Sequence, residues 1–254
     1  MNTQVKTRTE ILAMRESGKM LATILSDLIK SVEVGVSTKD IAILAARELK
    51  SLGAEAPFLG YQGFPDVICI SLNDEIVHGI PRPDKVIREG DLVSLDFGVK
   101  WRGMITDSAL TLIVGNPRDP QHRQLLSYTE ASLQEGIAAV HDGVRTGDIA
   151  AAVERVLKKH DYGIIRDLVG HGVGHQLHEG PNIPNYGRAN TGPWLKAGMT
   201  IAIEPMATLG TWKIKVDPDG WTVRSADGSM SAHFEHTVLI TKEGAEVLTL
   251  RNQS

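Results

Sequence analysis

The sequence contains one cysteine, Cys69, and its aromatic residues amount to only 5% of the chain. A single cysteine excludes an intramolecular disulfide and a zinc site built from cysteines. No apolar run approaches the length of a membrane span, and the N-terminal residues lack the apolar core of a signal peptide. We therefore expect a cytoplasmic protein.

An excess of basic charge is also missing. The 27 lysines and arginines are outnumbered by 31 aspartates and glutamates, a net charge of −4 (27 − 31), which argues against nucleic acid as the main partner. No linker rich in proline, glycine and serine divides the chain. A hydrophobic content of 42% and a charged content of 23% over 254 residues are ordinary for a globular protein, and we expect a single domain over residues 1–254.

What the chain does contain is a long internal repeat. VEVGVSTKDIA (32–42) resembles VHDGVRTGDIA (140–150), and REGDLVSLD (88–96) resembles KAGMTIAIE (196–204). The offset is the same in both pairs, since 143 − 35 and 204 − 96 are each 108. A period of this length is too long for a solenoid. It predicts two similar halves, about 8–115 and 116–250, related by a pseudo-two-fold axis.

Each half begins with helix-like segments and continues with strand-like ones. Apolar spacing predicts helices at 8–30, from Ser37 to near Gly53, at 120–141 and at 147–160, with Ser37 and Asp40 as a capping pair. Strands are predicted at VICISL, LVSLDFGV, ALTLIV, MTIAIEPM, WTVRS and HTVLIT. We expect an α+β fold, with helices on one face of a curved, mostly antiparallel sheet.

Four acids interrupt the strand-like runs: Asp96, Asp107, Glu204 and Glu235. Asp96 and Glu204 are related by the repeat, and Asp107 and Glu235 each begin a further apolar run. Four buried carboxylates meeting at a pseudo-two-fold axis would repel one another strongly. Two divalent cations roughly 3.5–4 Å apart would neutralise them and activate a water between them. The pattern therefore predicts a dinuclear metal site.

Histidines accompany the acids. His171, His175 and His178 lie in DLVGHGVGHQLHEGPNIPNYG, where the glycines between His171 and His175 argue against a helix. His78 and His178 match each other, since HGIP (78–81) and HEGP (178–181) both have proline three residues after the histidine. A single histidine is more often structural than catalytic, but this pair lies beside the predicted ligands. We expect His78 and His178 to contact the substrate.

Four segments together resemble the type I methionine aminopeptidases, which have the pita-bread fold: GYQGFPDVICISLNDEIVHGIP, GHGVGHQLHEGPNIPNYG, GMTIAIEPM and SAHFEHTVLI. The resemblance extends from about residue 8 to residue 250. It implies a single catalytic domain that removes the N-terminal methionine from nascent proteins. It also implies five metal ligands: Asp96, Asp107, His171, Glu204 and Glu235.

The resemblance implies a role for each of these residues. Asp107 and Glu235 would bridge two metal ions, Asp96 would bind one, and His171 and Glu204 would bind the other. Glu204 would also act as general base, while His78 would lie near the scissile amide nitrogen and His178 would stabilise the tetrahedral intermediate. Oxygen and imidazole donors suit Co²⁺, Mn²⁺ or Fe²⁺, and the sequence does not choose among them.

The methionine pocket implied by the resemblance has these residues: Tyr61, Phe64, Cys69, Leu177 and Trp221, with Phe58 at its rim. From the residues alone, ordinary core packing explains each of them equally well. Phe58 and Leu177 stand where a smaller residue and phenylalanine are common in the family. The segment MITD (104–107) also departs from the usual residues before the second aspartate.

Two alternatives remain open. One is an Xaa-Pro aminopeptidase or prolidase of the same fold, although this chain has no room for the large N-terminal domain usual in those enzymes. The other is a non-catalytic protein that kept the fold, which should have lost at least one ligand. We expect substrates with a small second residue, a monomeric protein and a transient ribosome contact. By the same rule, the bulky Asn2 predicts that this chain retains its own Met1.

Overall fold

The computed structural model describes residues 3–251. The prediction that Met1 is retained concerns residues outside this range. Over the described residues the helices are α1 (Arg8–Lys30), α2 (Thr38–Leu52), the short 3-10 helix η1 (Tyr61–Gly63), α3 (Pro120–Ala138) and α4 (Thr146–Lys159). All four predicted α-helices are confirmed, each within a few residues of the expected ends.

Local sequence sets the ends of these helices. The side chain of Ser37 accepts a hydrogen bond from the backbone N–H of Asp40, and Asp40 bonds back to Ser37, which confirms the predicted capping pair of α2. The helix ends at Gly53, whose φ of 66° is readily adopted only by glycine. Thr7 and Glu10 form the same reciprocal cap at the start of α1.

The strands form four antiparallel sheets with the orders β1-β3-β4, β10-β11-β2, β12-β9-β5 and β14-β13-β8-β6-β7. Their bounds are β1 Ile68–Leu72, β2 Glu75–Val77, β3 Leu92–Trp101, β4 Met104–Ile113, β5 Gly163–Ile164, β6 Gly170–Gly172, β7 Glu179–Ile183, β8 Thr200–Ile203, β9 Met206–Thr208, β10 Ile214–Val216, β11 Val223–Ser225, β12 Ser231–His233, β13 His236–Ile240 and β14 Ala245–Val247.

Two of the predicted strands differ from the structure. The run MTIAIEPM was predicted as one strand, but it is divided into β8 and β9, which belong to different sheets, and Glu204 and Pro205 lie between them. Proline lacks the N–H that a central strand needs, which accounts for the break. Strand β4 begins at Met104 rather than Ala109, so that Asp107 lies within the strand, opposite Gly98 of β3.

The two halves meet where β4 runs beside the start of β13. Ala109 and Glu235 exchange backbone hydrogen bonds of 2.9 and 3.3 Å. Next to them, the hydroxyl of Thr237 accepts from the N–H of Asp107 and donates to its carbonyl oxygen. Asp107 and Glu235, one from each half, are therefore held as close neighbours at the junction.

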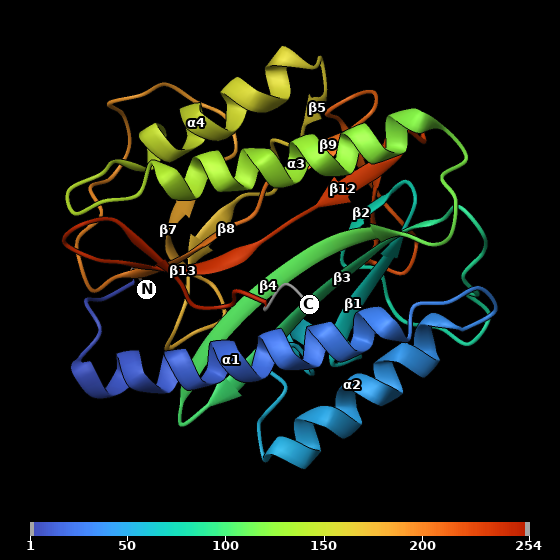
Figure 1. Ribbon diagram of the computed structural model, residues 1–254, viewed down its shortest axis with the longest axis horizontal. Helices are drawn as coiled ribbons and strands as arrows, with labels where there is room; N and C mark the ends of the chain where they lie inside the picture. Colours follow the sequence, from blue (N-terminus) through green and yellow to red (C-terminus); the bar gives the residue numbers. More distant parts are fainter. Residues whose placement is uncertain (1–2, 252–254) are drawn as a thin grey trace.

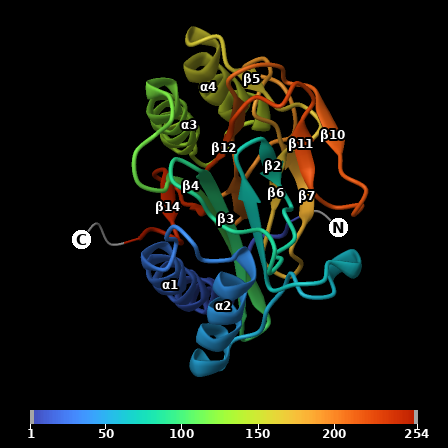
Figure 2. The same ribbon diagram turned by 90° about the vertical axis from the view of Figure 1, so that its right-hand side faces the viewer.

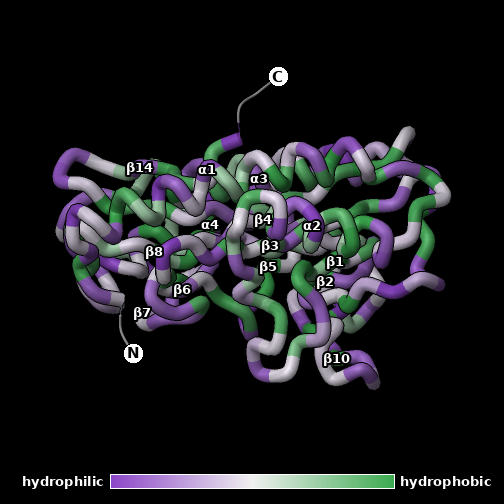
Figure 3. The backbone as a smooth tube through the Cα atoms, turned by 90° about the horizontal axis from the view of Figure 1, so that it is seen from below, coloured by the Kyte–Doolittle hydropathy of each residue, from purple (hydrophilic) through white to green (hydrophobic). Residues whose placement is uncertain are grey.

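The helices cover one face of the strands. Figure 1 shows α1 and α2 below β3 and β4, with α3 and α4 above, and Figure 2 shows β10 and β11 on the opposite side of the molecule from α1 and α3. Seen from below, α1 and α3 follow one edge of the molecule and β10 the other (Figure 3). One apolar core joins Leu25 of α1 and Leu133 of α3 to Leu95, Ile201 and other strand residues. The predicted α+β fold is confirmed.

Candidate metal centre and active site

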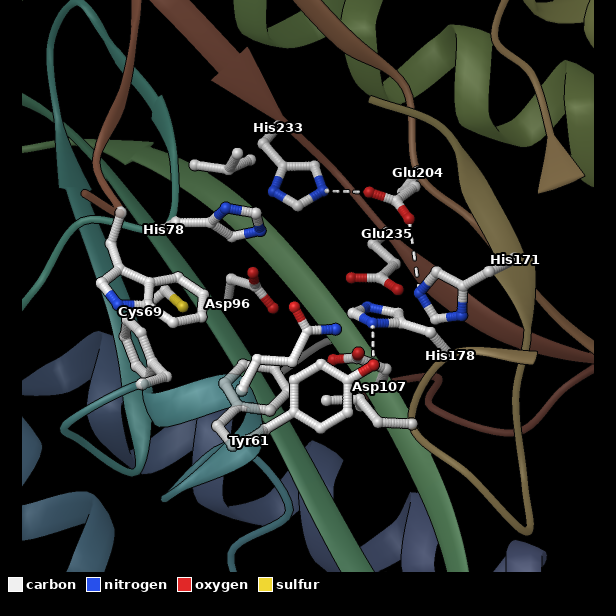
Figure 4. Close-up of a pocket in the computed structure, with 16 residues that line it drawn as sticks. Tyr61, Cys69, His78, Asp96, Asp107, His171, His178, Glu204, His233 and Glu235 are labelled. Atoms are coloured by element: carbon white, nitrogen blue, oxygen red, sulfur yellow. Dashed lines mark hydrogen bonds and ion pairs between the residues drawn. The ribbon is translucent and has the colours of Figure 1, made fainter. Parts of the chain in front are cut away.

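One cavity collects the residues predicted for the site. All five predicted ligands, both histidines of the matched pair and the whole predicted pocket line it, in the following set: Phe58, Tyr61, Gln62, Phe64, Cys69, Val77, His78, Asp96, Asp107, His171, Leu177, His178, Glu204, Trp221, His233 and Glu235. Figure 4 shows these side chains in front of the strands, with the helices behind. The acids thus lie on the face opposite the helices.

Four different strand positions supply the carboxylates. Asp96 lies in β3 between Cys69 of β1 and Ala109 of β4, and Asp107 lies in β4. Glu204 follows β8 directly, and Glu235 directly precedes β13. One donor atom each of Asp107, His171 and Glu235 lie within 4.8 Å of one another. These three residues, from distant parts of the chain, could hold one cation.

Asp107 and Glu235 are buried, Asp96 and Glu204 are largely buried, and little compensates their charge. Burial raises the pKa of Asp96 to about 7. Burial and the neighbouring acids raise the pKa of Asp107 and Glu235 well above the ordinary value, and the same causes act on Glu204. Asp96 Oδ1, Asp107 Oδ1 and Glu235 Oε1 have no hydrogen-bond partner among residues 3–251. Since a buried carboxylate needs a proton or a cation, the donor set fits divalent metal ions.

His171 adds a nitrogen donor. Its Nδ1 lies 2.9 Å from the carbonyl oxygen of Gly172, a hydrogen bond that places the proton on Nδ1 and leaves a lone pair on Nε2. That Nε2 lies 3.5 Å from Glu204 Oε1. Burial, together with His178, lowers the pKa of His171 to about 3, so the ring is neutral. His171 lies in the short strand β6, in keeping with the prediction that this segment is not helical.

His175 is not part of the site. Its Nε2 lies 2.8 Å from Glu10 Oε1 at the start of α1, outside the cavity. Histidines with HxxxH spacing bind one metal ion when both lie on the same face of a helix. This segment is not a helix, so His171 and His175 do not form such a motif.

His78 and His178 both reach the cavity. Burial and the neighbouring His178 lower the pKa of His78 to about 4. Burial also lowers the pKa of His178, whose Nδ1 lies 2.9 Å from the hydroxyl of Tyr61. The rings of His171 and His178 are in edge contact, with centroids 4.3 Å apart. Two neutral imidazoles thus lie beside the carboxylates (Figure 4).

One end of the cavity is apolar. Phe58, Phe64, Cys69 and Leu177 form a buried cluster, packed against Tyr61 and Trp221 in an arrangement that also includes Ile105 and Val173. The rings of Phe64 and Trp221 are in edge contact at 5.2 Å. The two residues that depart from the usual family pattern, Phe58 and Leu177, therefore belong to the same apolar cluster.

The MITD segment supports the same region. Ile105 belongs to the apolar cluster of the cavity, and the hydroxyl of Thr106 lies 2.8 Å from that of Ser17 in α1. Met104 packs instead with Met14 of α1 and Leu248. The unusual residues before Asp107 are therefore fully packed side chains of β4.

Sequence reasoning missed three residues that line the cavity: Gln62, Val77 and His233. His233 is two residues before Glu235, so both side chains point to the same face of an extended segment. Because side chains two residues apart in an extended segment share a face, the segment SAHFEH could have indicated that His233 faces the site together with Glu235.

A second cavity adjoins the first and shares His78, His171, His178 and Glu204 with it. It continues toward Asp167, Asn182 and Met206. The histidines and Glu204 therefore lie between an apolar end and a more polar extension, an arrangement that suits a peptide whose first side chain is apolar.

Comparison with known proteins agrees with this arrangement. The model of metallopeptidase family M24 matches residues 12–242. The methionine aminopeptidase of Mycoplasma capricolum and methionine aminopeptidase 1 of Bacillus subtilis are each 44% identical to this chain, with 96% of this chain covered and 97% and 98% of the relatives.

Solved structures give the same result. The crystal structure of methionine aminopeptidase from Thermotoga maritima has a TM-score of 0.95 at 42% identity, covering 97% of this chain and 99% of that one. A prolidase from Pyrococcus furiosus has a TM-score of 0.79 at 25% identity, and this chain covers 66% of it. The predicted pita-bread fold is confirmed, and the higher identity and TM-score favour the first group. The chain belongs to metallopeptidase family M24 and, within it, to the methionine aminopeptidases.

Proposed function

We propose that this protein hydrolyses the first peptide bond of peptides and nascent proteins that begin with methionine. The observation that carries the proposal is that one cavity joins an apolar end with four clustered carboxylates and His171. The whole chain, residues 1–254, would act as one catalytic domain, because backbone hydrogen bonds between Ala109 and Glu235 join the two halves beside the site.

Two divalent metal ions are the proposed cofactor. Asp107 and Glu235 would bind both ions, Asp96 one of them, and His171 with Glu204 the other. The donor atoms of Asp107, His171 and Glu235 within 4.8 Å of one another support this assignment, as do the facing atoms of His171 and Glu204. Oxygen and imidazole donors suit Mn²⁺, Fe²⁺ or Co²⁺. When bound, such ions polarise the scissile carbonyl and make water a better nucleophile at neutral pH.

Glu204, His178 and His78 would supply the proton transfer and the hydrogen bonds to the substrate. Glu204 would accept the proton of the attacking water. His178 would donate a hydrogen bond to the oxyanion, which contributes about 3 kcal/mol for a single donor. His78 would lie beside the scissile nitrogen and orient the substrate backbone.

The apolar end would bind the methionine side chain. Phe64, Cys69 and Trp221 offer it a wall without charge, and Phe58 with Leu177 closes the cluster. A flexible thioether fits such a surface well. We further propose that a small second residue is preferred, since the chain of the substrate must pass the histidines between the two cavities.

None of the helices within residues 3–251 has the length and apolar character needed to cross a membrane. We propose a cytoplasmic, monomeric enzyme that meets its substrates at or near the ribosome through transient contact.

A direct test compares the hydrolysis of Met-Ala-Ser with that of an Xaa-Pro peptide. The protein is stripped of metal and reloaded with Mn²⁺, Fe²⁺ or Co²⁺ in turn. We expect metal-dependent release of methionine and slower Xaa-Pro cleavage. Faster cleavage of the Xaa-Pro peptide, or activity that ignores the metal, would overturn the proposal.

A further inference from the structure

His233 is a buried side chain of the cavity that the mechanism above does not use. It ends β12, opposite Met206 of β9, and is 1% exposed. Its backbone is fixed by Thr111 of β4, whose hydroxyl accepts from the N–H of His233 at 2.8 Å and donates to its carbonyl oxygen at 2.9 Å. With the backbone held in this way, the imidazole projects into the cavity (Figure 4).

The polar atoms of the His233 ring are unpaired in the described part of the chain. Neither Nδ1 nor Nε2 of His233 has a hydrogen-bond partner there, although buried polar groups are nearly always paired. An imidazole carries at least one N–H whether it is neutral or protonated. A buried imidazole with an unpaired donor, aimed into a cavity, indicates a partner that completes its bonding.

Glu204 is that partner. Nε2 of His233 lies 3.7 Å from Glu204 Oε2, while Nε2 of His171 lies 3.5 Å from Glu204 Oε1. Figure 4 shows the carboxylate between the two rings. The backbone oxygen of Glu204 accepts a hydrogen bond of 3.0 Å from the side chain of Asn185, so the main chain is fixed and only the side-chain torsions remain to be set.

We propose that His233 is a positioning residue, which donates from Nε2 to Oε2 of Glu204 and thereby holds Oε1 toward His171. The gap of 3.7 Å closes with a small movement of the carboxylate. A hydrogen bond of this kind orients a metal-binding carboxylate, and the loss of such a partner typically weakens metal binding by roughly 10–100-fold. The inference rests on the proposed function, because it assigns Glu204 to the metal and the proton.

The test uses three substitutions of His233. In His233→Gln, the amide nitrogen lies as many bonds from Cβ as Nε2 does and keeps a donor. In His233→Asn, the nitrogen lies one bond nearer and cannot reach. In His233→Leu, the donor is lost while the volume is largely kept. His122→Leu is the matched control, since His122 in α3 is also buried with an unpaired Nδ1 but lies in neither cavity.

Two readouts are measured: the dissociation constant of Mn²⁺ by calorimetry, and kcat with KM on Met-Ala-Ser. We expect His233→Leu and His233→Asn to raise the Mn²⁺ dissociation constant roughly 10–100-fold. kcat should fall by a similar factor and KM should change little, while His233→Gln should stay within about 3-fold of the parent protein. His122→Leu should leave both readouts unchanged.

A purely structural role gives a different pattern. If His233→Leu binds Mn²⁺ as the parent does, or if Gln and Asn at this position behave alike, the inference is wrong. Should His233→Leu fail to fold, the Gln and Asn pair decides the question. Failure of the parent protein to cleave Met-Ala-Ser would refute the proposed function instead, and the calorimetric comparison would still test His233.

Discussion

His171 Nε2 lies 3.5 Å from Glu204 Oε1, and the hydrogen bond of His171 Nδ1 to the Gly172 carbonyl oxygen leaves Nε2 with a lone pair. Two acceptors that face each other at this distance repel unless a proton or a cation lies between them. Without metal, the raised pKa of Glu204 provides the proton. With metal, the proposed assignment makes the same two atoms ligands of one ion.

Asp107→Asn should abolish metal-dependent activity and leave the fold intact. The substitution keeps the shape of the side chain but removes one of the charges that hold the ions, and the loss of several kcal/mol corresponds to about 10³-fold or more in kcat/KM. The melting temperature of the metal-free variant should equal or exceed that of the metal-free parent, because the introduced amide needs no proton taken up against the raised pKa of Asp107. Kinetics and differential scanning calorimetry measure both.

Asp84→Asn is the control for this experiment, since the Asp84 side chain is 75% exposed and lies outside the cavity. Substantial turnover by Asp107→Asn with saturating Mn²⁺ would contradict the assignment of Asp107.

The stability of the metal-free protein should fall as the pH rises from about 6.5 to 8. Asp96 has a pKa raised to about 7, so folding favours its protonated form, and this stabilisation is lost as the pH rises through that value. The pKa values of Asp107, Glu204 and Glu235 are raised as well and act in the same direction.

The buried histidines act in the opposite direction, but only at lower pH. Their folded pKa values are depressed, as for His78 at about 4 and His171 at about 3, so their stabilisation is present above the unfolded pKa near 6.5 and is lost below it. Above pH 6.5 the histidines no longer contribute to the slope, and the raised pKa values of the acids lower the stability as the pH rises. Thermal unfolding at several pH values measures this dependence of stability on pH. Added Mn²⁺ should reverse the slope. A metal-free melting temperature that rises from pH 6.5 to 8 would count against the clustered carboxylates.

Tyr61→Phe should lower kcat about 5-fold and leave metal affinity unchanged. The Tyr61 hydroxyl lies 2.9 Å from His178 Nδ1, and by donating to Nδ1 it keeps the proton of His178 on Nε2, where it can reach an oxyanion. One hydrogen bond contributes about 1 kcal/mol, which corresponds to this factor. Steady-state kinetics and Mn²⁺ calorimetry test it, with Tyr162→Phe as a control outside the cavity. Equal kcat values for Tyr61→Phe and the parent would show that Tyr61 does not orient His178.

Lys6→Met should destabilise the protein by about 3–5 kcal/mol, because it leaves a buried charge without its partner. Lys6 Nζ lies 3.2 Å from Glu179 Oε2, and both side chains are almost completely buried, at 0% and 2% exposure. Glu179 follows His178 directly, so activity should fall together with stability. Chemical denaturation gives the free energy of unfolding.

The double variant Lys6→Met/Glu179→Gln should recover part of the loss, since no unpaired charge remains. Lys30→Met is the matched control, because its pair with Asp27 is exposed and should cost less than about 1 kcal/mol. A loss as small for Lys6→Met as for Lys30→Met would contradict this prediction.

Much of the site could be predicted because the repeat constrains it. The offset of 108 residues between Asp96 and Glu204 reflects equivalent positions of the two halves, and acids in apolar strands are conspicuous for their cost of burial. The ends of the helices could also be predicted from the sequence, since Ser37 with Asp40 and the glycine after α2 are local signals.

Other features depend on contacts that spacing does not reveal. The pairing of His175 with Glu10 joins residues 165 positions apart, so the sequence could not show where His175 points. His233 was missed because its neighbours read as an ordinary strand. The sequence also did not show that Phe58 and Leu177, the two departures from the family pattern, lie in one apolar cluster.

The central claim is that Asp96, Asp107, His171, Glu204 and Glu235 hold two metal ions in one cavity. Crystals of the metal-free protein soaked in Mn²⁺ and measured for anomalous scattering test it most directly. The account predicts two anomalous peaks, each within bonding distance of these side chains. No peak there, or peaks bound by other residues, would contradict it.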